Sequence, residues 1–206
     1  MKTKELSPKS VWPPVTSFFV FLVYLFTTGT TVSFYRDSGE LITAASTLSI
    51  AHSPGYPLYM IMGKFFTEVL ALLGAGPAYA MNIFSALCGA LAVYFIILAV
   101  SELTDNIYAA EFAGLLAAFT YINWMLAVVA EMYSLSLMLG ALLLYLMIQK
   151  RYILFSFIFG LSLGNHLSIL FAVLPMAAAL YLFPSRRKKI PFISAVLYFT
   201  LGLSVY

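Results

Sequence analysis

Long apolar runs separated by short polar segments make up most of this chain. The first run, Val15 to Phe34, has about the 20 residues that a helix needs to cross the hydrocarbon core of a bilayer. Further runs lie at Ala78 to Ser101, Tyr108 to Met125, Ala127 to Ile148, Tyr152 to Leu163, Leu167 to Phe183 and Pro191 to Tyr206. This pattern predicts an all-α polytopic membrane protein with six or seven transmembrane helices.

The segment Pro57 to Leu73 is also apolar, but Lys64 and Glu68 interrupt it at helical spacing. This pattern favours an amphipathic helix that lies on the membrane surface. A tilted span with a paired Lys and Glu is the alternative. Residues 35–73 would then form the first extracytoplasmic loop, with surface helices at Ser38 to Ala51 and Pro57 to Leu73.

The two ends of the chain support different expectations. The first apolar run is too long for a signal-peptide core and lacks a small-x-small cleavage site, so we interpret it as a retained signal anchor. The last run stops at Tyr206 without a polar flank, which predicts that the natural protein continues further. No soluble domain or low-complexity linker is evident, so residues 1–206 are interpreted as one transmembrane domain.

Composition excludes a soluble globule. Apolar residues make up 63% of the chain, charged residues 9%, and the mean hydropathy is +0.97, which leaves too little polar surface to cover a folded core. The single cysteine, Cys88, offers no disulfide framework and no metal cluster. The net charge is +3, but the sequence predicts no soluble surface on which basic residues could form a patch. Nucleic acid is therefore not an expected partner.

Basic residues predict the orientation, because Lys and Arg in short loops are retained in the cytoplasm. They form three clusters, each separated from the next by an even number of predicted crossings: Lys2, Lys4 and Lys9, then Lys150 and Arg151, then Arg186, Arg187, Lys188 and Lys189. All three face the cytoplasm if Pro57 to Leu73 does not cross. The N-terminus is therefore predicted to be cytoplasmic.

This topology places a set of scarce polar residues together on the outer side: Asp37, Glu40, His52, Glu131, Asn165 and His166. Ionisable groups at a membrane boundary usually mark a pathway or a reacting site. These residues come from three separate loops, and their convergence on one side is what a site at the membrane surface requires.

Structural roles remain open for the same residues. Asp37 and Glu40 fit a capping box, in which each residue bonds the other's backbone, although capping does not exclude catalysis. For Glu131, the structural alternative is an interior salt bridge with Arg36 or His166. We also expect the turn at His52 to face Asp37 and Asn165.

Glycines near the last of these loops have a packing interpretation. Gly160 and Gly164 flank the small Ser162, and small residues at this spacing let helices approach closely. Close packing explains the glycines, but it does not explain the Asn165–His166 pair that follows them.

Four motifs in order resemble the DUF2723 family of membrane proteins: DSGE from Asp37, HSPGYPLY from His52, AEMYSL from Ala130 and GLSLGNH from Gly160. That family is regarded as a branch of the GT-C glycosyltransferases that O-mannosylate proteins. One departure is visible, because the family usually has His-Pro-Pro-Gly where Ser53 replaces the first proline here. Family members also continue with further spans.

The resemblance implies a GT-C-like helical bundle that transfers a sugar, with mannose the expected one, from a polyprenyl phosphate donor to Ser or Thr hydroxyls of exported proteins at the extracytoplasmic face. Asp37 would be the general base, with Glu40 orienting the acceptor. Substrate-binding residues would be Arg36, His52, Tyr56, Glu131, Tyr133, Asn165 and His166. No metal and no cofactor are expected. A bacterial inner membrane, or the endoplasmic reticulum in a eukaryote, is the expected location.

A different class of function competes with this one. In an ion- or proton-coupled transporter, or in a non-catalytic membrane subunit, the same carboxylates and histidines would form a relay. Transport predicts ionisable groups near the bilayer midplane and inverted internal repeats. Here the ionisable groups cluster at one face and no repeat is visible, which favours the transferase.

Overall fold

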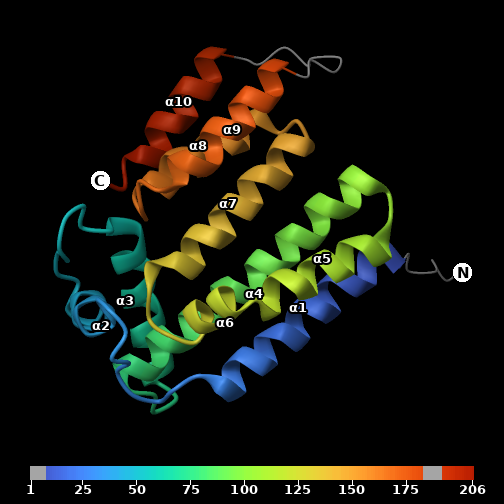
Figure 1. Cartoon of the computed structure of the whole chain (residues 1–206). Helices are drawn as coiled ribbons and strands as arrows, with labels where there is room; N and C mark the ends of the chain where they lie inside the picture. Colours follow the sequence, from blue (N-terminus) through green and yellow to red (C-terminus); the bar gives the residue numbers. More distant parts are fainter. Residues whose placement is uncertain (1–7, 183–191) are drawn as a thin grey trace, which may run out of the picture.

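The computed structural model describes residues 8–182 and 192–206, and every regular element within them is a helix (Figure 1). In chain order these are α1 (Pro8–Thr27), α2 (Ser38–Thr47), α3 (Pro57–Ala71), α4 (Pro77–Thr104), α5 (Ile107–Phe119), α6 (Tyr121–Ala127), α7 (Met132–Ile148), α8 (Tyr152–Leu163), α9 (Ile169–Leu182) and α10 (Phe192–Leu203). The all-α prediction is confirmed for this part of the chain.

Helix length and composition identify the candidate membrane spans. Ser10–Thr27 of α1 and the whole of α4 are long and apolar enough to cross, and α5 with α6 makes a third candidate if the pair is one bent span. Helices α7 and α8, residues Ile169–Ala179 of α9, and α10 are apolar but shorter. The count of six or seven spans therefore stays a prediction.

The first predicted span ends earlier than the apolar run does. Helix α1 stops at Thr27, whose hydroxyl donates to the carbonyls of Val23 and Tyr24. Beyond it, the carbonyls of Gly29 and Thr31 accept hydrogen bonds from the Asn82 side chain at 2.8 and 3.2 Å. The prediction that the span continues to Phe34 is wrong, because side-chain bonds replace helical bonds here.

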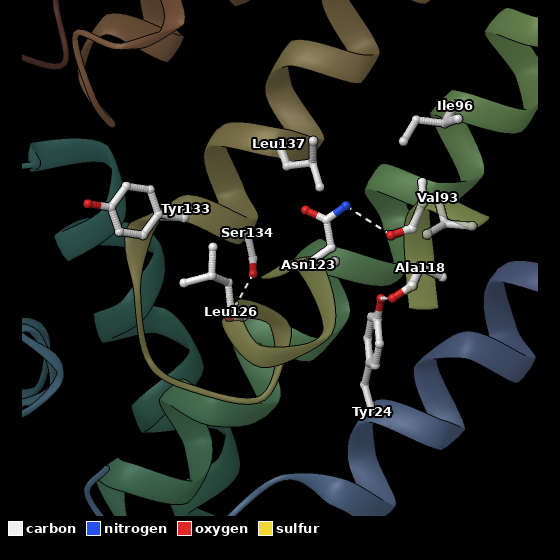
Figure 2. A pocket seen from close by; sticks show the side chains of 11 residues that line it. Tyr24, Val93, Ile96, Ala118, Asn123, Leu126, Tyr133, Ser134 and Leu137 are labelled. Atoms are coloured by element: carbon white, nitrogen blue, oxygen red, sulfur yellow. Dashed lines mark hydrogen bonds between the residues drawn. The ribbon is translucent and has the colours of Figure 1, made fainter. Parts of the chain in front are cut away.

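The third predicted span, Tyr108 to Met125, is broken at Thr120, where α5 and α6 meet at 67°. The freed carbonyls at the break have new donors: Asn123 donates to Ala117, and the Tyr24 hydroxyl donates to Ala118 (Figure 2). The break and the extended segment after α6 also delay the next helix. It begins at Met132 and not at Ala127 as expected.

Helix α4 is the central element of the packing. On one side it packs with α1 and α5 through the buried residues Val20, Tyr24, Val93 and Ile97. On another it packs with α3 and α7 through a second core, whose large buried side chains include Leu41, Tyr59, Phe84, Leu135 and Leu143. Two apolar faces in use on one helix explain why α4 is apolar all round.

Helices α8 and α10 approach each other at glycines. A Cβ atom at Gly160 would collide with the carbonyl of Phe199, and one at Gly202 would collide with the carbonyl of Phe157. The interpretation of Gly160 as a close-packing residue is therefore confirmed. Close contact of these two backbones fixes the end of α8, from which the Asn165–His166 loop departs.

Helices α2 and α3 form the predicted pair between α1 and α4. Helix α2 ends at Thr47 and not at Ala51, because Leu48 takes the left-handed conformation and Ser49 bonds back to the Ala44 carbonyl. Lys64 of α3 donates to the Ser46 carbonyl at 2.8 Å and pairs with Glu68. Lys64 thus stabilises the carboxyl end of α2, a role that its spacing did not reveal.

One end of the molecule gathers the loops of interest. Helices α2 and α3, the segment that leads into α7, and the end of α8 lie together at one side of Figure 1, away from the N-terminus. The Leu58 backbone N–H donates to the Gly164 carbonyl at 2.9 Å, which ties the start of α3 to the loop after α8. The sequence-predicted site residues lie in these segments or directly next to them.

Candidate functional site

Asp37, Glu40 and His52 come together as the sequence predicted. Glu40 accepts the backbone N–H of His52 at 2.6 Å, and its other oxygen lies 3.0 Å from His52 Nδ1. The Nε2 atom of His52 lies 3.8 Å from Asp37 Oδ2. The backbone hydrogen bond from His52, followed by the ring hydrogen bond, lowers the pKa of Glu40. Glu40 is therefore a carboxylate at neutral pH.

The capping box does not form. Asp37 occupies the position before α2, but its side chain makes no capping hydrogen bond. Glu40 bonds His52, and the Asp37 backbone N–H donates to Glu131 Oε1 at 3.2 Å. The Asp37 carboxylate therefore does not have the capping role that the Asp-x-x-Glu spacing indicated. It is partly exposed, so it can meet a ligand.

Tyr56 connects His52 to the third loop. Its hydroxyl lies 2.8 Å from His52 Nε2, and its buried ring stacks on His166 with centroids 5.8 Å apart and planes at 7°. Burial, followed by the charge of Asp37, raises the pKa of Tyr56, so its hydroxyl stays protonated. Both histidines therefore contact one phenol ring, His52 edge to face and His166 stacked.

His166 is held by its neighbour Ser168, whose backbone N–H donates to Nδ1 at 3.0 Å. Burial lowers the pKa of His166, so the ring is neutral at pH 7 with its hydrogen on Nε2. A neutral imidazole can donate a hydrogen bond to a ligand. It contributes no positive charge to offset a phosphate.

Glu131 is fully buried at the start of α7. Its Oε1 accepts the Asp37 N–H, its own N–H lies 3.4 Å from Ser85 Oγ, and its Oε2 has no partner. Between residues 8 and 182 no ion pair joins Glu131 to Arg36 or His166, so the interior salt bridge is wrong. Arg36 is exposed and donates to the Tyr133 hydroxyl at 3.3 Å.

Replacing Glu131 by Gln should stabilise the protein at high pH. Burial raises the pKa of Glu131 from 4.5 to about 7. The folded chain therefore holds this proton more tightly than the unfolded chain, and stability is lost as pH rises from about 4.5 to about 7. Gln keeps an oxygen for the Asp37 N–H and carries no charge. Allowing for screening by nearby water, we expect a gain of about 1 to 2 kcal/mol at pH 8.

The measurement is the melting temperature of both proteins in one detergent at pH 5 and pH 8. The variant should melt higher than the wild type at pH 8 by a margin that shrinks at pH 5. An equal difference at both pH values would contradict a buried, titrating Glu131.

Asn165 lies in the interior of the site wall. Its amide donates to the Met132 carbonyl at 3.1 Å and to Ser136 Oγ at 2.7 Å, and the residue is 1% exposed. These bonds hold the loop after α8 against the start of α7. The structure thus gives Asn165 a positioning role, whereas the neighbouring His166 and Tyr133 are partly exposed. The turn at His52 faces Asp37, as expected, but the amide of Asn165 bonds Met132 and Ser136 and makes no described contact with His52.

Asn82 is a site-building residue that the sequence analysis missed. Its amide holds the Gly29 and Thr31 carbonyls ahead of Asp37, and its Oδ1 accepts the Ala130 N–H at 2.8 Å. One side chain thus joins both segments that carry the carboxylates. A lone amide within the apolar run of α4 was the available signal.

The three clustered groups could also hold a cation. Asp37, Glu40 and His52 each offer one ligand atom, and these atoms lie within 4.8 Å of one another. Carboxylates and an imidazole suit several divalent metals. The sequence analysis predicted that these residues converge but expected no metal, because the short distances between their ligand atoms depend on the turn that returns His52 to the start of α2.

The fold and the site define a helical membrane protein with a cluster of ionisable side chains beside one end of its apolar helices. The chain belongs to the family of the protein O-mannosyl-transferase TMEM260 N-terminal domain, whose model matches residues 37–190.

Two relatives agree with this assignment. Protein O-mannosyl-transferase tmem260 of Dictyostelium discoideum is 27% identical over 193 residues, covering 82% of this chain and 24% of the relative. Protein O-mannosyl-transferase TMEM260 of Mus musculus is 31% identical over 179 residues, covering 82% of this chain and 25% of the relative. The chain thus spans about a quarter of the length of these curated relatives. No solved structure matches it.

Proposed function

We propose that the full-length protein transfers mannose from a polyprenyl phosphate donor to Ser or Thr hydroxyls of exported proteins. The relatives' names support protein O-mannosylation. The observation that carries the proposal is the meeting of Asp37, Glu40 and His52 at the end of an apolar helical bundle, with Tyr56 and Glu131 in direct contact with them. A hydroxyl acceptor needs a base, and this cluster offers a partly exposed carboxylate.

Asp37 is assigned the role of general base. Its side chain makes no capping bond and is 44% exposed, so an acceptor hydroxyl can reach it. A positioned carboxylate that removes a proton during attack typically contributes about 10²- to 10⁴-fold to the rate.

Arg36 is the cation best placed for the donor phosphate. Its guanidinium is exposed, and its hydrogen bond to Tyr133 leaves further donors for a phosphate oxygen. An uncharged His166 can add a hydrogen bond. Positive charge and donors aimed at the leaving phosphate stabilise the charge that develops there as the sugar departs.

An apolar hollow beside the His52 turn fits the lipid part of such a donor. It is lined by Leu48, Ile50, Pro54, Met60 and Ile61, among others, and Ile50 is 89% exposed. Exposed apolar surface next to a polar cluster is the arrangement that a lipid with a charged head requires.

The proposed topology places this end of the molecule outside the cytoplasm, in a bacterial inner membrane or an endoplasmic reticulum membrane. It depends on basic clusters of which Lys2, Lys4 and Arg186 to Lys189 lie outside the described residues. Lys150 and Arg151 follow α7 at the end of that helix away from Glu131. The GT-C architecture and the DUF2723 name remain predictions.

The test is transfer of labelled mannose by the purified full-length protein to a Ser/Thr-containing acceptor from an exported protein. We expect product with a polyprenyl phosphate mannose donor and none with a nucleotide-linked mannose. A parallel reaction with a chelator shows whether the Asp37–Glu40–His52 group needs a divalent ion. Absence of transfer from every polyprenyl phosphate sugar would overturn the proposal in favour of a transporter.

A further inference from the structure

We propose that Glu40, His52 and Tyr56 form a proton relay behind Asp37, in which His52 receives the acceptor proton from Asp37 and Glu40 sets the tautomer of His52. This inference rests on the proposed transferase function and assigns new roles within the same site. Glu40 becomes a positioning residue that acts through His52, where the sequence analysis had it orient the acceptor.

The contacts of Glu40 determine which nitrogen of His52 carries hydrogen. A carboxylate can only accept hydrogen bonds, and Glu40 bonds both the backbone N–H of His52 and Nδ1. Nδ1 of the neutral ring must therefore carry the hydrogen, which leaves the lone pair on Nε2. Two contacts from one side chain also fix the orientation of the ring.

The free nitrogen points at the groups that the relay needs. Nε2 lies 2.8 Å from the Tyr56 hydroxyl, which donates to it, and 3.8 Å from Asp37 Oδ2. The second distance exceeds a hydrogen bond, and a small rotation of the Asp37 side chain would close it. His52 is 40% exposed, so it can pass the proton on to solvent.

The proton balance is complete without another reactant. The acceptor oxygen forms a bond to the sugar carbon, the bond from that carbon to the phosphate oxygen breaks, and the lipid phosphate leaves with the electron pair. The hydroxyl proton passes to Asp37 and then to Nε2 of His52. The Tyr56 hydroxyl turns from donor to acceptor, and the imidazolium lies between two carboxylates.

Two carboxylates and a phenol surround the His52 ring. Asp37 and Glu40 of the α2 segment lie on two sides of the ring, and Tyr56 of α3 contacts it. Behind them, α7 contributes Glu131 and Tyr133, and the loop after α8 contributes His166, which stacks on Tyr56. Arg36 is the nearby cation, and one of its N–H groups donates to the Tyr133 hydroxyl.

The test uses the full-length protein and measures mannose transfer across pH for wild type, His52→Ala and Glu40→Gln. We expect His52→Ala to lower kcat by about 10²-fold and free imidazole to restore part of it, since the vacated site is open to solvent. Glu40→Gln should lower kcat at unchanged acceptor KM, because an amide N–H would place the hydrogen on the wrong nitrogen. Both variants should change the acid side of the pH profile.

Controls separate this inference from the proposed function. His166→Ala removes the other histidine and should gain nothing from imidazole, and Tyr56→Phe keeps the stacked ring while removing the hydroxyl. If His52→Ala does not fold, His52→Gln supplies the same pH profile.

A wild type without transfer would overturn the function itself. The relay alone would be overturned if the wild type is active and the His52 variants keep normal kcat and pH dependence. It would also be overturned if those variants lose kcat and imidazole restores none of it. A Glu40→Gln effect confined to KM would remove Glu40 from the relay.

Discussion

Asp37→Asn should lower the rate of mannose transfer by about 10²- to 10⁴-fold and leave the melting temperature unchanged. An amide cannot take the acceptor proton at neutral pH, but it matches the carboxylate in size. The Asp37 side chain makes no capping bond, and its backbone bond to Glu131 survives the substitution. The measurement is the initial rate at saturating donor, with melting followed in parallel.

Asp105→Asn is the matched control, because it removes a carboxylate at the far end of α4. Asp105 takes a left-handed conformation after that helix, which Asn tolerates well. Its transfer rate should equal that of the wild type. Near-normal transfer by Asp37→Asn would remove Asp37 as the base.

Asn82→Ala should lower both stability and transfer. The substitution leaves the buried Ala130 N–H without a partner and releases the Gly29 and Thr31 carbonyls. A buried orphan donor costs about 1 to 3 kcal/mol, whereas the exposed Gly29 carbonyl finds water. The segments that carry Asp37 and Glu131 lose their common anchor, so we expect lower kcat as well as a lower melting temperature.

Asn123→Ala tests whether this effect is specific. Asn123 makes one bond, to the Ala117 carbonyl, which also accepts from the Thr120 hydroxyl. Its loss should cost less stability and leave the site intact. Equal losses of transfer in the two variants would contradict the anchoring role of Asn82.

The sequence predicted the helical class and the members of the site better than it predicted their contacts. Apolar runs located α4, α8, α9 and α10 within a few residues, because burial in lipid or in a core needs the same apolar composition. The sequence pattern did not predict where α1 and α2 end, and it did not predict the break at Thr120. Those features depend on side chains that donate to freed carbonyls, such as Asn82 and Tyr24, from distant parts of the chain.

The site shows the same division. Scarcity of charge was enough to single out Asp37, Glu40, His52 and Glu131. Their partners were not predictable, since the local Asp-x-x-Glu pattern indicated a capping box while the folded chain pairs Glu40 with His52, 12 positions away. The contacts of Glu40 with His52 take the place of the local capping bonds. The spacing of residues in the sequence does not predict such a long-range contact.

The most direct measurement of where the substrates meet is photo-crosslinking in the full-length protein. A photoreactive residue replaces Ser53, which is exposed beside His52, and in a control replaces Tyr108, which is 82% exposed at the start of α5. A labelled acceptor peptide should attach at position 53 in the presence of donor and not at position 108. Attachment at position 108 with none at position 53 would contradict a transfer site built from Asp37, Glu40 and His52.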